Sequence, residues 1–114
     1  MLDFKTAREL YELCYSNNQL ELDQLEYVQV EGWVRTNRDN GKIGFIELND
    51  GTYFKNIQVV YSGELDNYKD ITKMLTGTSI SVTGKFIHTP DNKQPFELEA
   101  TEVTLIGACD ESFP

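Results

Sequence analysis

The first part of the chain carries apolar residues at three- and four-residue intervals, as one face of a helix does. These residues are Phe4, Ala7, Tyr11 and Cys14. They predict a helix over residues 3–16. Thr6 and Glu9 have the spacing of a capping box, which supports a helix start in this region. The acidic, leucine-containing residues 20–26 are predicted to connect this helix to the following strands.

From Tyr27 onward the hydrophobic period changes to two, which is typical of half-buried β-strands. A strand is predicted from Tyr27 to the Asn-Gly turn at residues 39–42. Gly32 is predicted to mark a bend or bulge within this strand. A short helix is predicted over residues 64–75, ended by Gly77. The other predicted strands span residues 43–48, 53–61, 78–87 and 96–106.

The order of these elements is three strands, a helix and two further strands. We therefore expect a mainly β protein, a five-stranded Greek-key barrel of the OB-fold type. Its helix lies between the third and fourth strands, and an extra helix precedes the barrel. Barrels of this type bind oligonucleotides and oligosaccharides on the face of their second and third strands.

Composition places the chain among single-domain proteins. It has 114 residues, of which 39% are hydrophobic, and this is enough for one core. Neither a membrane span nor a signal peptide is present in the sequence, which predicts a soluble cytoplasmic domain. Cys14 and Cys109 lie far apart without metal-ligand spacing, so two unpaired thiols are expected.

The formal net charge of −9 argues against generic nucleic-acid binding, which normally requires an excess of Lys and Arg. The charge is nevertheless uneven along the chain. Residues 1–31 carry seven acids and two bases, and residues 94–114 carry five acids and no base. Residues 32–60 carry three acids and four bases. Any contact with RNA must therefore depend on a local site in the middle of the chain.

Residues suited to single-stranded RNA occur together in this middle region. If Ile46 and Ile57 face the core, then Phe45 and Gln58 point outward on adjacent strands. An exposed aromatic ring can stack on a base, and a nearby amide can pair with a base edge. Arg35 and Arg38 are placed to hold phosphates or bases. Singly, each of these residue types is more often a core ring or a solvated polar side chain.

Other polar residues have ordinary structural interpretations. His88, the only histidine, is expected in a surface loop without a nucleophile or acid to form a triad. The acid pairs Glu97/Glu99 and Glu64/Asp66 are expected to be solvated. Trp33 is expected to pack in the core or against a helix. No catalytic residue and no metal site is predicted.

Long ordered motifs add a family resemblance to this pattern. The stretches VEGWVRTNRD, GFIELNDG and FKNIQVV closely resemble asparaginyl-tRNA synthetases. The later GK, TP, KQPFEL and DESFP motifs fit the same family. The resemblance covers roughly residues 24–114, while the N-terminal helix is less typical. It implies an extra segment at residues 1–23, an anticodon-binding OB-fold at 24–108 and a hinge to an absent catalytic domain beginning at 109–114.

The resemblance also implies roles for individual residues. It implies that Phe45 stacks on an anticodon base, that Gln58 reads a base edge and that Arg38 contacts the anticodon. A glutamate of the last strand contacts the anticodon in relatives, and Glu97 is favoured over Glu99. Arg35 is expected to assist with the RNA backbone.

The function implied is recognition of the tRNA(Asn) anticodon, with a uridine as its middle base, by one domain of an asparagine–tRNA ligase. The parent enzyme would be a homodimer using ATP and Mg²⁺ in another domain, so this fragment alone would be non-catalytic and without cofactor. Three alternatives remain open: an aspartyl or lysyl enzyme domain, a stand-alone OB-fold protein that binds single-stranded nucleic acid, and a protein-interaction module docking through the acidic N-terminal helix.

Overall fold

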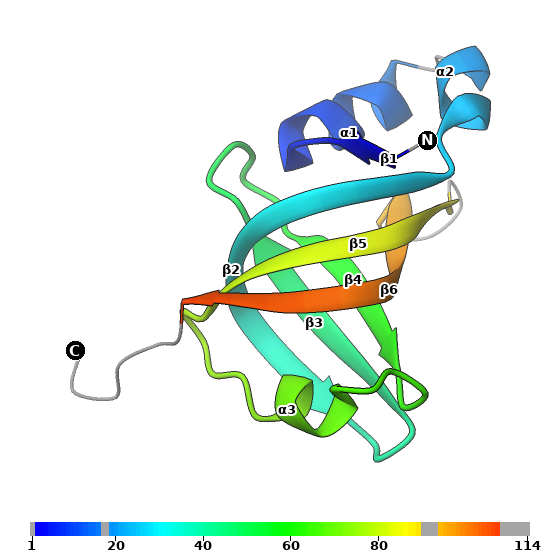
Figure 1. The fold of residues 1–114 in the computed structure, drawn as a ribbon. Coiled ribbons are helices and arrows are strands. Elements are labelled where there is room, and N and C mark those ends of the chain that lie inside the picture. The colour runs from blue at the N-terminus through cyan, green and yellow to red at the C-terminus, as the bar shows by residue number, and fades with distance from the viewer. Residues whose placement is uncertain (1, 17–18, 90–93, 108–114) are drawn as a thin grey trace.

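A closed five-stranded barrel dominates the computed structural model, which describes residues 2–16, 19–89 and 94–107 (Figure 1). Its strands are β2 (Tyr27–Asp39), β3 (Ile43–Asn49), β4 (Ile57–Ser62), β5 (Ser79–His88) and β6 (Phe96–Gly107). They follow the order β2-β3-β4-β6-β5, and β5 pairs back with β2 to close the barrel. The β4–β6 pair is parallel, and the other barrel pairs are antiparallel. The predicted OB-fold barrel is confirmed.

Alternating side chains of these strands fill the barrel interior. In β3, for example, Gly44, Ile46 and Leu48 are buried while the residues between them are half-buried. Each strand contributes branched aliphatic residues to one core, among them Val28, Val30, Val34, Ile57, Val59, Ile80, Val82 and Leu98. Complete burial of such a side chain stabilises the fold by about 1.5–3 kcal/mol.

The N-terminal segment differs from its prediction. Residues 2–4 form β1 (Leu2–Phe4), which pairs in parallel with the start of β2, so the helix does not begin at residue 3. Helix α1 spans Ala7–Tyr15, and the predicted Thr6–Glu9 capping box is present. The connector contains a second helix, α2 (Gln19–Gln24). The capping box is a local signal that can be read from the sequence. Strand β1, in contrast, forms only when the folded β2 provides an edge for it to pair with.

Helix α1 covers one end of the barrel and shares its core (Figure 1). The Tyr11 ring meets the Phe96 ring edge-on, with the ring centroids 4.9 Å apart. Ala7, Leu10 and Cys14 lie in the same buried cluster as the barrel residues. Burial raises the pKa of the unpaired Cys14 thiol to about 11. Cys109 and the predicted hinge at 109–114 lie outside the described residues.

Two predicted elements are shorter than expected. Strand β4 begins at Ile57 instead of residue 53, because Tyr53 leaves the sheet and stacks on Tyr11 with a centroid distance of 4.7 Å. Helix α3 spans Tyr68–Thr72 and not residues 64–75. Gly77 has a φ of 95° and lies in the turn before β5, so it does not end the helix. Strands β3, β5 and β6 match their predictions to within about one residue at each end.

The irregularity in β2 lies beyond Gly32. The β2–β3 register shifts between Val34 and Thr36, which makes Arg35 the extra residue. Gly32 stays in register with β5, and its missing side chain makes room for the Asn49 backbone, which a Cβ would overlap. Trp33 is 38% exposed and lies against Gly51, so of its two predicted positions the one in the core is wrong.

Candidate nucleic-acid interface

Two rows of side chains cross the outer face of β2, β3, β4 and β6. Register aligns Arg38 with Phe45, Phe45 with Val60 and Val60 with Glu99. Directly paired residues share one face of a sheet, with Cβ atoms about 4.5–5.5 Å apart. Phe45 therefore lies outward beside Arg38, half-buried between buried Gly44 and Ile46. The outward position predicted for Phe45 and the proximity of Arg38 to it are both present in the structure.

The second row contains the predicted base-reading amide. Register aligns Thr36 with Glu47 and Glu47 with Gln58. Gln58 Nε2 donates a hydrogen bond to Glu97 Oε2 at 3.3 Å. Glu97 is therefore the glutamate beside the amide, whereas Glu99 lies in the row of Phe45 and is more exposed. The structure brings Phe45, Arg38, Gln58 and Glu97 together on one face.

Polar residues that sequence reasoning did not single out extend the second row. Asn56 Nδ2 donates to Glu47 Oε2 at 3.4 Å, and Asn49 Nδ2 donates to Asn56 Oδ1 at 2.9 Å. Amide and carboxylate groups thus continue from Gln58 toward the β3–β4 loop. A signal for them exists in the sequence, since Asn56 and Glu47 have the same period-two positions as Gln58 and Phe45.

Arg35 is separated from these rows by the irregularity in β2. Its side chain is exposed, and its backbone carbonyl accepts a hydrogen bond from Thr76 Oγ1 at 3.1 Å. The register shift leaves Arg35 without a partner position on β3, while Thr36 resumes pairing with Glu47. Arg35 is therefore not aligned with Phe45 or Gln58.

A buried brace supports the Phe45 end of the face. Tyr61 donates a hydrogen bond to Asn37 Oδ1 at 2.6 Å, and Asn37 Nδ2 donates to the Ile71 carbonyl of α3 at 2.8 Å. Burial raises the pKa of Tyr61 to about 12, so its hydroxyl stays protonated and donates. A Cβ at Gly44 would overlap the Tyr61 ring, so this glycine allows the ring to pack directly beneath the strand that carries Phe45.

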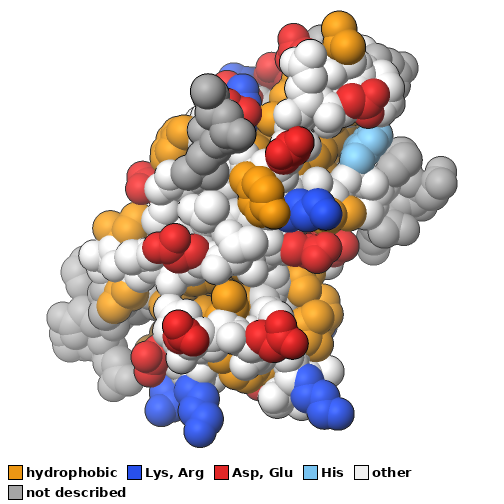
Figure 2. All heavy atoms as spheres, turned by 45° about the vertical axis from the view of Figure 1, so that its right-hand side comes forward, with side chains coloured by type: hydrophobic (Ala, Val, Ile, Leu, Met, Phe, Trp, Pro, Cys, Tyr) orange, Lys and Arg blue, Asp and Glu red, His pale blue; other side chains and the backbone are white. Residues whose placement is uncertain are grey.

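Charges of both signs occur around the interface. Figure 2 shows acidic, hydrophobic and some basic side chains mixed over the face drawn there, and further basic side chains at its lower end, where α3 and the β2–β3 turn lie in Figure 1. Basic residues in these elements include Arg38, Lys42 and Lys69. Carboxylates of Glu47 and Glu97 lie in the second row. The two rows thus combine carboxylates, whose oxygens accept hydrogen bonds, with the cation of Arg38.

The described residues contain no group of three or more His, Cys, Asp or Glu side chains arranged to hold a metal ion. Within the same residues, no helix has the length and apolar character needed to cross a membrane. His88 is the last residue of β5 and is half-buried. His88 therefore lies at the end of a strand, paired with Phe96, and not in the predicted surface loop.

Comparisons with known proteins agree with the OB-fold barrel. The family model for the tRNA anti-codon domain, described as an OB-fold nucleic acid binding domain, matches residues 28–106. The asparagine–tRNA ligase of Bacillus cytotoxicus is 53% identical over 87 residues, covering 76% of this chain and 19% of the relative. The ligase of Clostridium acetobutylicum is 51% identical with the same coverage. The chain spans about a fifth of the length of these relatives.

A solved structure supports the fold independently. The crystal structure of asparaginyl-tRNA synthetase from Pyrococcus horikoshii matches with a TM-score of 0.66 and 24% identity, over 75% of this chain and 21% of that chain. The identity to the two asparagine–tRNA ligases confirms the sequence resemblance to asparaginyl-tRNA synthetases. Because the family model matches well over half of its residues, the chain belongs to the family of OB-fold nucleic acid binding domains of the tRNA anti-codon type.

Proposed function

We propose that this chain recognises the anticodon loop of tRNA(Asn) through the outer face of β2, β3, β4 and β6. The observation that carries the proposal is the Phe45 ring beside Arg38, one row away from the Gln58–Glu97 pair. Single-stranded RNA is bound by such combinations of a stacking ring, a base-reading amide and a nearby cation.

Each group has a distinct chemical part in this proposal. Phe45 offers its ring to an unstacked base, and Arg38 neutralises a neighbouring phosphate. Gln58 donates one N–H to Glu97, which leaves its second N–H and its carbonyl oxygen for a base. A donor beside an acceptor complements the N3–H and carbonyl oxygen on the edge of uracil. This matches a uridine as the middle base of the anticodon.

The activity of the longer relatives is also part of the proposal. We infer that the chain serves an asparagine–tRNA ligase acting in cytoplasmic translation as a homodimer. The remaining four-fifths of the relatives' length would activate asparagine with ATP and Mg²⁺ and esterify the tRNA. This chain's own residues would bind and orient the anticodon, and we assign them no catalytic step.

The first test is a binding titration against an asparagine-tRNA anticodon stem-loop and a copy with its middle uridine replaced. We expect tighter binding to the uridine loop. Phe45→Ala should weaken that binding by about 1–3 kcal/mol, because one stacking platform is lost. Phe45→Leu is the matched control for packing, since it keeps an apolar side chain without the ring.

Other outcomes of this titration would contradict the proposal in distinguishable ways. Equal affinity for both loops would indicate a general single-strand binder. If neither loop bound and the protein dimerised with rising concentration, an interaction module would explain the chain better. Full RNA affinity in a folded Phe45→Ala protein would contradict only the stacking role of Phe45.

A further inference from the structure

Phe54 is the most exposed large hydrophobic residue among those the structure describes, with 80% of its surface accessible. It lies in the β3–β4 loop next to Tyr53, with the two ring centroids 4.6 Å apart. Lys55 Nζ lies 5.7 Å from the Phe54 ring centroid and 5.5 Å from that of Tyr15 on α1. It also donates a hydrogen bond to the Tyr15 hydroxyl at 3.0 Å. An accessible ring is thus joined to a cation and a second aromatic.

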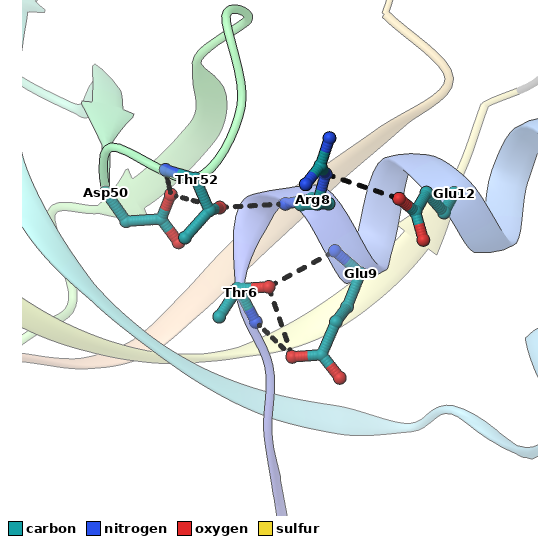
Figure 3. A network of polar contacts seen from close by, with 6 residues as sticks. All are labelled: Thr6, Arg8, Glu9, Glu12, Asp50 and Thr52. Carbon is teal, nitrogen blue, oxygen red and sulfur yellow. Dashed lines mark hydrogen bonds and ion pairs between the residues drawn. The ribbon is translucent and has the colours of Figure 1, made fainter.

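The loop that carries Phe54 is attached to the N-terminal helix at several points, one of which, between Thr52 and Arg8, is drawn in Figure 3. Asp50 Oδ2 accepts a hydrogen bond from the Ala7 backbone N–H at 2.8 Å, and Thr52 Oγ1 accepts from the Arg8 N–H at 3.0 Å. Stacking of Tyr53 on Tyr11 adds a buried contact. The Phe54 ring therefore lies on an anchored loop. Because the loop is already ordered, a ligand that binds there loses less free energy to ordering it.

The Phe54 loop is continuous with the proposed RNA interface. Lys55 is followed by Asn56, whose amide contacts Glu47 in the row of Gln58. Asn56 and Gln58 are two residues apart, which corresponds to about 7 Å along an extended chain. OB-folds bind about 4–16 nucleotides per fold, which is a longer segment than Phe45 and Gln58 can contact alone.

We propose that Phe54, with Lys55 and Tyr15, is a second stacking platform that holds a single-stranded RNA base flanking those at Phe45 and Gln58. This inference rests on the proposed function and adds to it a role for the N-terminal helix. RNA fits the platform better than an apolar protein surface does, because the Lys55 cation lies close to both the Phe54 and the Tyr15 ring. Lys55 would neutralise a phosphate while Phe54 stacks on the base.

The experiment compares Phe54→Ala with the parent chain in titrations against the anticodon stem-loop carrying 2-aminopurine at a flanking position. We expect Phe54→Ala to weaken binding by about 5- to 150-fold and to abolish the quenching of 2-aminopurine. Phe54→Trp should retain both. The preference for the middle uridine should persist in Phe54→Ala, because Gln58 is intact.

Phe4→Ala is the matched control, because Phe4 is an exposed ring on β1 outside the proposed interface. It should leave affinity unchanged. Thermal unfolding of each variant shows whether the fold is retained, and Lys55→Met gives a second probe that should weaken binding and make it less dependent on salt.

Three results would overturn the inference. If Phe54→Ala binds within twofold of the parent while Phe45→Ala loses binding, the second platform is absent and the proposed function survives. If the parent chain binds no RNA, both fail together. If Phe54→Ala leaves RNA affinity unchanged but removes concentration-dependent dimerisation, the exposed ring belongs to a protein interface.

Discussion

At Gln58, a single hydrogen bond to Glu97 orients the side-chain amide. An unconstrained glutamine can present its carbonyl and amino groups in either order, so it pairs equally well with uracil or cytosine. The carboxylate of Glu97 can accept hydrogen bonds but cannot donate them. It therefore selects the orientation in which Gln58 Nε2 points toward it. In the proposed function, Glu97 is therefore a positioning residue for Gln58.

We predict that Glu97→Gln reduces the preference for uridine over cytidine at the middle anticodon position. The substituted amide can donate as well as accept, so Gln58 is free to reverse. Gln58→Ala should lower the same preference by about 1–3 kcal/mol, the usual value of a bidentate base contact. Parallel titrations with uridine and cytidine loops measure both effects, and Glu99→Gln is the control. Equal losses for every loop would contradict a base-reading role.

The β3–β4 loop is the element that connects the barrel to the N-terminal helix α1. Its side chains Asp50 and Thr52 accept hydrogen bonds from the Ala7 and Arg8 N–H groups in the first turn of α1. These N–H groups have no partner within the helix, so the loop completes the capping that Thr6 begins. The N-terminal helix and the barrel thereby stabilise each other.

Removal of the Asp50 carboxylate should therefore destabilise the chain. We expect Asp50→Ala to lower the free energy of unfolding by about 0.5–2 kcal/mol, as loss of a helix-capping side chain usually does. Urea denaturation measures the change. The exposed Asp66 provides the control substitution Asp66→Ala, which should have a smaller effect. Equal stability of the two variants would show that the loop does not anchor α1.

On the scale of the whole molecule, the net charge of −9 opposes contact with RNA. Binding must then depend on a small number of cations at the interface and on uncharged contacts such as stacking. Arg38 and Lys55 lie at or next to the proposed contact surface. Arg8, by comparison, forms an ion pair with Glu12 at 3.3 Å on α1.

We predict a shallow dependence of RNA affinity on salt. With two phosphates neutralised, log K should fall with log salt at a slope of about −1.4, taking about −0.7 per contact for single strands. Arg38→Gln should reduce the slope by about half, whereas Arg8→Gln should leave it unchanged. Titrations between low and physiological salt measure the slope. A much steeper slope would indicate that general electrostatic attraction dominates binding.

Local patterns were sufficient for most strands and for the outward position of Phe45 and Gln58. They failed where a partner distant in sequence changes the local structure. Tyr53 has a strand-forming side chain but packs on Tyr11, and Trp33 lies at the surface although large rings are usually buried. Neither contact has a signal within its own segment of the chain.

By itself, the sequence determined which side of each strand faces the core, because the period of two is a local property of the backbone. It also contained the Thr6–Glu9 capping box of α1, because this signal acts over three residues, although the predicted helix began too early, at residue 3. Only the tertiary structure decided that Glu97 lies beside Gln58 and that Asp50 accepts a hydrogen bond from Ala7 in the first turn of α1. These neighbours are 39 and 43 residues apart in sequence, and barrel closure and helix packing bring them together.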